Sequence, residues 1–215
     1  EHKVAAIKAF KKEGYEFYAS AKNISHEANL NQGKTSIDLH WDILRPGRTR
    51  IPMAPRFLDT RVDYGSHWAM SDEATLFVML VHPVFVKYGT TPQAALMRMV
   101  DIAKLLAKSN VNWKAVIQLL DEAGLKTAAW ITLSWLELLT GKQQHKHIMS
   151  ALKPSVPKQK YLQYWLHKNL SSRLLNKPVY VQLGFTLPAH DRWGDAFRAI
   201  RQARKLAQSQ DKNLT

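Results

Sequence analysis

The sequence contains no cysteine, so neither disulfides nor thiolate metal sites can form. It also lacks a membrane-spanning stretch, because its longest apolar run, 127–139, falls short of the roughly 20 residues that a transmembrane helix needs and contains Glu137. Residues 1–14 carry four lysines among scattered apolar side chains, which is not a secretory signal pattern. We therefore expect a folded protein of the cytoplasm, without a transmembrane segment.

Acidic residues are scarce: 17 stand against 31 basic ones, for a formal net charge of +14. The imbalance lies in residues 142–215, which hold 14 basic and 3 acidic residues. Such a basic region favours phosphate-bearing partners, namely nucleotides, nucleic acid or an anionic lipid surface. A solvated, solubilising surface would explain the same charge, so both readings stay open. Hydrophobic residues make up 46% of the 215, ample for a core.

The most regular pattern of the chain occupies residues 35–43. Four apolar residues alternate with three polar ones, a period of two that predicts a half-buried strand: Ile37, Leu39, Trp41 and Ile43 against Asp38, His40 and Asp42. One strand face would thus carry two carboxylates and an imidazole. Residues 25–30 are expected to pair with this strand as a hairpin, since Asn31-Gln32-Gly33-Lys34 supplies turn residues.

A short helix over Lys3–Lys12 and a strand over Tyr15–Ala19 are predicted before the hairpin. The polar segment Arg45–Ser66, punctuated by prolines, is expected to be an irregular connection. We expect an α+β fold: a partial sheet in a first domain, residues 1–60, and a mostly helical C-terminal region in a second, residues 61–215.

Helical patterns follow the connection. Ser71 and Asn112 are expected to cap two of the helices, and prolines and glycines punctuate the others. The predicted helices run from Ser71 to His82, where Pro83 should stop the helix, from Pro92 to Lys108, from Asn112 to Gly124, from Thr127 to Thr140 as the central buried helix, from Lys158 to Leu175 after a linker at Lys153–Pro157, and from Asp191 to Gln208. Val179–Gly184 reads as a short strand.

The run Ile37-Asp38-Leu39-His40-Trp41, reached through a helix ending in Gly14-Tyr15, resembles the uncharacterised bacterial nucleotidyltransferase family of the DNA polymerase β superfamily. The resemblance extends over residues 3–141. It continues in the order of three further segments: Leu80-Val81-His82, Arg98-Met99-Val100-Asp101-Ile102-Ala103, and Asn112-Trp113 with Gly124 closing that helix.

The resemblance implies transfer of a nucleoside monophosphate from a nucleoside triphosphate to an acceptor, with two Mg²⁺ ions held by three carboxylates. By its place in the pattern, Asp38 would be the third carboxylate, a metal ligand and catalytic residue. The other two form an Asp-x-Asp pair in the family, and no two of the ten aspartates here are spaced that way. We expect either a fragment cut after that strand or a lineage that lost it, inactive as this chain.

The other residues of the candidate site each have a structural alternative. His40 and Asp42 could contact substrate or support Asp38, or simply be polar positions of the strand. A Zn²⁺ or Mn²⁺ site made of Asp38, His40 and Asp42 is a further alternative, but three ligands from one strand converge poorly. His82 could contact nucleotide or pack at a helix end. Arg98 and Asp101 could line a cleft or pair on the helix surface.

His145 and His147 are weak metal candidates, since neither has a cysteine or acidic neighbour. In the last helix, Arg198, Arg201 and Lys205 form a basic stripe opposite Trp193, Phe197 and Ile200, and could contact phosphate or nucleic acid. The alternative to an enzyme is therefore a non-catalytic nucleotide- or nucleic-acid-binding module. A third reading is an interaction protein, with the apolar helix 127–140 and the tryptophans forming an oligomer interface.

Overall fold

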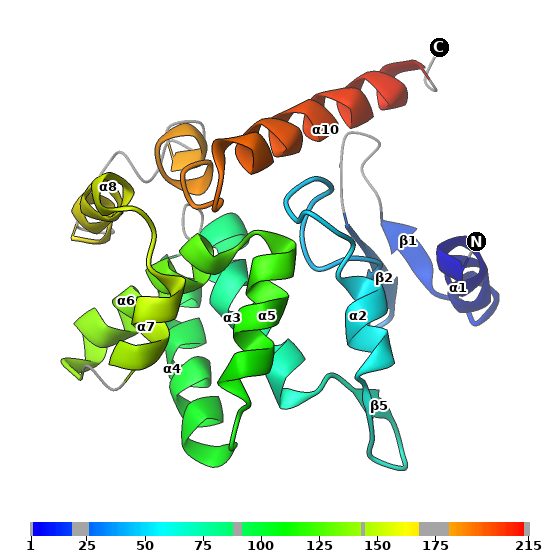
Figure 1. Cartoon of the computed structure of the whole chain (residues 1–215). Helices are drawn as coiled ribbons and strands as arrows, with labels where there is room; N and C mark the ends of the chain where they lie inside the picture. Colours follow the sequence, from blue (N-terminus) through cyan, green and yellow to red (C-terminus); the bar gives the residue numbers. More distant parts are fainter. Residues whose placement is uncertain (1, 19–25, 88–91, 143–144, 168–180, 213–215) are drawn as a thin grey trace. The chain divides into compact units, whose positions relative to one another are not determined.

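The computed structural model describes residues 2–18, 26–87, 92–142, 145–167 and 181–212 (Figure 1). The fold is α+β, as predicted, with a three-stranded sheet, a two-stranded sheet and a largely helical remainder. Two compact units are present, one formed by Glu1–Arg48 with Arg198–Thr215 and the other by Thr49–Phe197. The domain boundary at residue 60 stays a prediction, because compactness alone does not define an independently folding domain.

The first unit contains the helix, strand and hairpin that the sequence predicts. Its sheet is antiparallel in the order β1-β2-β3. The two residues Gly33 and Lys34 turn the chain between β2 and β3, and Gly33 has a φ of 56°. The elements are α1 (His2–Lys12), β1 (Glu16–Tyr18), β2 (Glu27–Gln32) and β3 (Thr35–His40).

The hairpin has one apolar face, because Ala28 and Leu30 are buried and pair with Leu39 and Ile37. The predicted continuation of the strand to Ile43 is wrong, since β3 ends at His40.

Beyond that end, the Asp42 carboxylate accepts a hydrogen bond from the amide of Ile43 at 2.8 Å. Aspartate commonly bonds nearby backbone in this way and competes with strand pairing. Asp42 therefore lies in a bend after the strand.

The segment 45–66 is more ordered than predicted. It contains helix α2 (Ala54–Asp59), and its end forms strand β4 (Val62–Asp63), which pairs with β5 (Trp68–Ala69). Pro55 lies in the first turn of α2, where a missing N–H costs nothing, so this proline marks a helix start. Phe57 anchors the helix in the core.

The second unit is built around four helices at the places the sequence predicts. Ser71 and Asn112 cap two of them, accepting hydrogen bonds from the amides of Ala74 and Ala115 at 3.2 and 3.3 Å. Helix α3 packs against α4, α5 and α6. The four helices are α3 (Asp72–His82), α4 (Pro92–Lys108), α5 (Trp113–Ala123) and α6 (Lys126–Thr140).

Helix α6 is the central buried helix, as predicted. Trp130 and Trp135 are both buried, and the Thr132 hydroxyl donates to the carbonyl of Leu80 at 2.6 Å. These tryptophans serve the core of their own unit, and oligomerisation stays a prediction. None of the helices among the described residues is long and apolar enough to cross a membrane.

Three predictions about helix and strand ends were wrong, and one helix was not predicted. Pro83 does not stop the chain's helical path, which continues as the π-helix η1 (Pro83–Lys87). Helix α7 (Lys146–Leu152) occupies part of the basic segment and was not predicted. Helix α8 (Val156–Leu166) ends with His167 as its C-cap, so the predicted helix does not run on unbroken to residue 175; residues 168–175 lie outside the described part. The expected strand 179–184 is wrong, because residue 181 is helical and the π-helix η2 (Gln182–Thr186) follows it; residues 179–180 lie outside the described part.

The last helix, α10 (Trp193–Lys212), was predicted, but not the face that it buries. Trp193 and Phe197 are 61% and 67% exposed, whereas Asp195, Ala196 and Ala199 are buried. Small side chains allow a close approach of backbones, and the Asp195 carboxylate has an ion-pair partner described below. Packing thus overrides the apolar stripe that the sequence shows.

Candidate functional site

The polar face of the β2–β3 hairpin carries the residues that the sequence singled out. Successive side chains of a strand alternate between faces, so residues two apart share one face. Across the two strands, this face pairs Glu27 with His40 and Asn29 with Asp38. We call these four residues, together with His26 immediately before β2, the hairpin polar face.

Asp38 is exposed near the centre of this face, and Asn29 fixes its carboxylate. The Asn29 amide Nδ2 donates to Asp38 Oδ1 at 2.8 Å and to the Ser36 hydroxyl at 3.1 Å. The second carboxylate oxygen, Oδ2, has no partner within the described ranges. An oriented carboxylate with one available oxygen is suited to binding a hard cation.

His26, Glu27 and His40 form a cluster at the open end of the hairpin. One ligand atom from each lies within 4.8 Å of the other two. The Glu27 Oε2 atom lies 3.4 Å from His40 Nε2 and 3.9 Å from His26 Nε2. The two imidazole centroids are 5.6 Å apart.

His26 enters this cluster because the hairpin pairing continues past the strand end. The amide of Trp41 donates to the carbonyl of His26 at 3.0 Å. The His26 side chain is buried, and burial lowers the pKa of its imidazole, with Glu27 and Asp42 opposing and His40 and Arg45 adding to that effect. The folded protein therefore favours a neutral imidazole here.

The sequence pointed to Asp38 and His40 but missed His26 and Glu27. Alternation alone puts His26 and Glu27 on opposite faces, so their convergence follows from the bend at residue 26. The sequence signal that could have indicated the cluster is the presence of His26 and His40 at the two chain ends of the predicted hairpin, opposite its turn. Asp42, in its bend, is not a member of the converging set among the residues described.

Three predicted site residues belong to the second unit, which is described by itself. Arg98 and Asp101 pair on α4, with Nη1 and Oδ2 3.6 Å apart and both side chains well exposed. This is the surface pairing that their spacing suggested. His82 is half-buried at the C-terminal end of α3.

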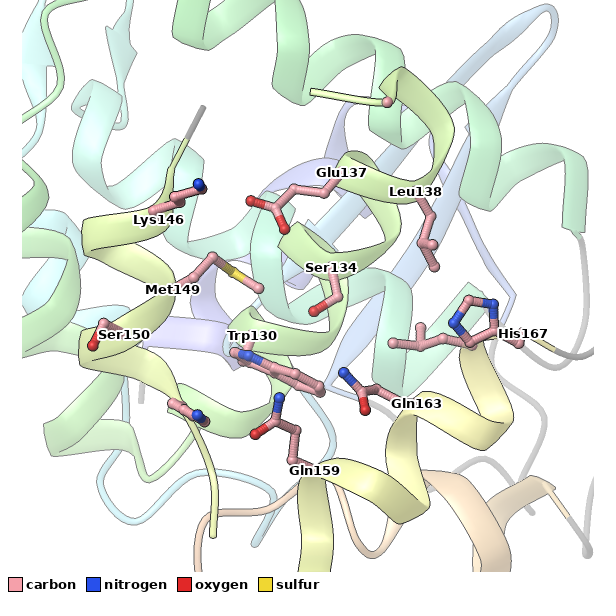
Figure 2. Close-up of a pocket in the computed structure, with 13 residues that line it drawn as sticks. Trp130, Ser134, Glu137, Leu138, Lys146, Met149, Ser150, Gln159, Gln163 and His167 are labelled. Atoms are coloured by element: carbon pink, nitrogen blue, oxygen red, sulfur yellow. The ribbon is translucent and has the colours of Figure 1, made fainter. Parts of the chain in front are cut away.

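A cleft of about 730 Å³ opens among α6, α7 and α8 of the second unit. Figure 2 shows Lys146 and Glu137 at one end and Gln159 and Gln163 beside Trp130 at the other. Its mixed polar lining fits a polar small molecule better than an apolar one. None of the candidate catalytic, metal-binding or phosphate-binding residues named from the sequence lines it.

The basic residues of α10 differ in their exposure to solvent. Arg201 and Lys205 are exposed, as is Arg204 between them, whereas Arg198 is half-buried. The exposed three form a continuous basic surface on the helix because their spacings of three and four residues place them on one side.

Comparison with known families identifies the class to which this hairpin and these helices belong. The model of a family described as uncharacterised nucleotidyltransferase matches residues 2–141, which is more than half of the chain. The chain therefore belongs to this nucleotidyltransferase family, as its resemblance predicted. The matched region contains the whole hairpin polar face and ends where Gly141 caps α6. No match was found among curated proteins or among solved structures.

Proposed function

We propose that the hairpin polar face is the nucleotide-facing surface of a nucleotidyltransferase, with Asp38 as one carboxylate ligand of the Mg²⁺ that accompanies the nucleoside triphosphate. One observation carries the proposal. Within the family-matched region, Asp38 stands exposed on a regular strand with one oxygen fixed by Asn29 and the other directed to no described partner. Pre-oriented carboxylates are what a cation site requires.

The donor set on this face does not fit a pair of Mg²⁺ ions. Mg²⁺ prefers oxygen ligands, and two such ions need several carboxylates. Here Asp38 is paired across the strands with an amide, Asn29, while Glu27 lies against the imidazoles of His26 and His40. These 215 residues contain no Asp-x-Asp pair. Asp38 is therefore proposed as a ligand of a single Mg²⁺.

The reaction in question joins an acceptor oxygen to the α-phosphorus of the nucleoside triphosphate, breaks the bond to the bridging oxygen and releases pyrophosphate; the acceptor's proton goes to solvent or a base. The acceptor could be a small molecule, a protein hydroxyl or an RNA end. Asp38 contributes to positioning the triphosphate. We expect these 215 residues to bind it without turnover, because charge neutralisation by one carboxylate-held ion is incomplete.

Binding of a fluorescent ATP analogue, measured by anisotropy with and without Mg²⁺, tests this proposal. We expect Mg²⁺-dependent binding that weakens by about tenfold or more in Asp38→Asn, which keeps the side-chain size and removes the charge, a loss of about 1.4 kcal/mol. Asp59→Asn is the matched control, an exposed aspartate at the end of α2. Equal binding by the wild type and Asp38→Asn would overturn the role of Asp38. Pyrophosphate release by the 215-residue chain would overturn the expected inactivity.

The exposed basic surface of α10 supports a second candidate, a non-catalytic module that binds nucleotide or nucleic acid. Residues 142–215, with their 14 basic and 3 acidic residues, lie outside the family match. Electrostatic binding to a single strand weakens with salt, with a log–log slope of about −0.7 per phosphate contact.

Replacing Arg201, Arg204 and Lys205 by alanine should therefore reduce the slope for a labelled RNA oligonucleotide by about 2. Removal of three exposed lysines elsewhere, Lys104, Lys108 and Lys114, is the control. An equal reduction in both variants would show that net charge, and not this surface, binds the strand.

A further inference from the structure

We propose that His26, Glu27 and His40 form a Zn²⁺ site at the open end of the β2–β3 hairpin. This site is distinct from the proposed Mg²⁺-binding position at Asp38, because Asp38 is not one of its three ligands. It brings together residues from the start of one strand and the end of the next, which pair directly as Glu27 and His40.

The distances match those between ligands of a tetrahedral zinc ion. With bonds of about 2.0–2.1 Å, neighbouring ligand atoms around Zn²⁺ lie about 3.3–3.4 Å apart. Glu27 Oε2 and His40 Nε2 are already 3.4 Å apart, and Glu27 Oε2 and His26 Nε2 are 3.9 Å apart. The widest separation in the set is within 4.8 Å, so small rotations of side chains close the site.

The burial of His26 is the second observation. Its side chain is only 5% exposed, and neither ring nitrogen has a hydrogen-bond partner among the residues described. A buried polar atom without a partner is costly, and native proteins rarely leave one so. A metal ion bound to Nε2 would give one of the two buried nitrogens a partner and remove part of this cost.

The donor chemistry selects the ion. Two imidazoles and one carboxylate suit Zn²⁺, which takes nitrogen and oxygen ligands and often keeps a fourth position for water. Mg²⁺ and Ca²⁺ prefer oxygen alone. His40 and Glu27 are 44% and 45% exposed, so the fourth position opens to solvent. The ion would fasten the two strand ends together at this open position.

Titration of the metal-free chain with Zn²⁺, in competition with a chromogenic chelator, tests the proposal. We expect one ion bound per chain, no competition from excess Mg²⁺, and a higher melting temperature with Zn²⁺. His40→Ala and Glu27→Gln should each weaken binding at least tenfold, because even outer-shell changes cost 10–100-fold. Both residues are half-exposed, so these variants avoid the buried His26 and should fold.

Two control variants separate this site from other sources of Zn²⁺ binding. His147→Ala removes an exposed histidine from α7, and Asp38→Asn changes the neighbouring carboxylate on the same strand. Both should bind Zn²⁺ as the wild type does, whatever the nucleotide experiment shows. The proposal is overturned if the wild type binds no Zn²⁺, if His40→Ala and Glu27→Gln weaken binding less than tenfold, or if either control weakens it as much as they do.

Discussion

Arg50 and Asp195, 145 residues apart, form a two-pronged ion pair in the second unit. Nη2 of Arg50 donates to Asp195 Oδ2 at 2.7 Å, and Nε lies 3.1 Å from both carboxylate oxygens. The Asp195 side chain is 7% exposed and that of Arg50 is 22% exposed. The hydrogen bond to Asp195 raises the pKa of Arg50. The pair holds the first turn of α10 against the segment around Arg50, at the start of the second unit.

Arg50→Ala should lower the free energy of unfolding by about 3–5 kcal/mol, because it removes the bidentate ion-pair partner of the buried Asp195 carboxylate. Urea denaturation, followed by the helical signal in circular dichroism, measures this loss of unfolding free energy. Arg56→Ala is the matched control, since Arg56 pairs with Glu122 at 3.0 Å but is 54% exposed. It should cost less than about 1 kcal/mol. Similar losses of unfolding free energy in both variants would contradict the stabilising role proposed for the Arg50–Asp195 pair.

Asp191→Ala should cost about 0.5–2 kcal/mol, the usual effect of losing an N-cap. Helix α6 has no side-chain cap of its own, and the carboxylate of Asp191 accepts from the amides of Thr127 and Lys126 at 2.7 and 3.2 Å. The same denaturation experiment measures the change. Asp101→Ala, which removes an exposed i,i+3 pair, should cost about 0.2–0.5 kcal/mol. A smaller loss for Asp191→Ala than for Asp101→Ala would disprove the cap.

Gly124→Ala should be more destabilising than Gly141→Ala. Both glycines end helices with positive φ, 75° and 66°, so both alanines incur the left-handed cost of about 1–2 kcal/mol. Only at Gly124 would the new Cβ lie 2.6 Å from Nε of Arg50, displacing the guanidinium from Asp195; at Gly141 nothing lies within 4 Å. Melting temperatures of the two variants compare them directly, and equal values would argue against the close packing of Arg50.

The stability of the metal-free protein should fall as the pH drops below about 6.5, the ordinary pKa of histidine, because burial lowers the pKa of His26. In that range the unfolded chain binds a proton at His26 that the folded chain resists, so stability rises with pH. Glu27 and Asp42 oppose the shift, while His40 and Arg45 add to it. Urea midpoints with a chelator present, between pH 7.5 and pH 5.5 (roughly one unit either side of that pKa), should change less in His26→Gln than in the wild type. An unchanged slope in the variant would assign the effect to other groups.

The sequence predicts elements whose causes are local. Ser71 and Asn112 cap helices through their own neighbouring amides, so their positions could be recognised without tertiary structure. The cap of α6 comes from Asp191, 64 residues after Thr127, and no local pattern announces it. The exposed faces of Trp193 and Phe197 likewise follow from distant packing and not from periodicity.

The candidate site likewise combines features with local causes, which the sequence predicts, and features set by contacts that it does not reveal. Alternation placed Asp38 and His40 on one face of β3, because strand pairing enforces it locally. The predicted continuation of the strand to Ile43 is wrong, because the Asp42 carboxylate accepts a hydrogen bond from the amide of Ile43 and the chain bends there. His26 joins the cluster through pairing of Trp41 with its carbonyl after the strand ends, which alternation cannot express.

The most direct test of the central claim is paramagnetic broadening by Mn²⁺, which replaces Mg²⁺ on the nucleoside triphosphate. The measurement is an amide NMR spectrum of the isotope-labelled chain with ATP and trace Mn²⁺. If Asp38 binds the cation, amides of residues 28–30 and 37–39 should broaden in the wild type and recover in Asp38→Asn. Broadening that persists in Asp38→Asn, or that centres on α10 and leaves the hairpin sharp, would contradict the proposed nucleotide-facing surface.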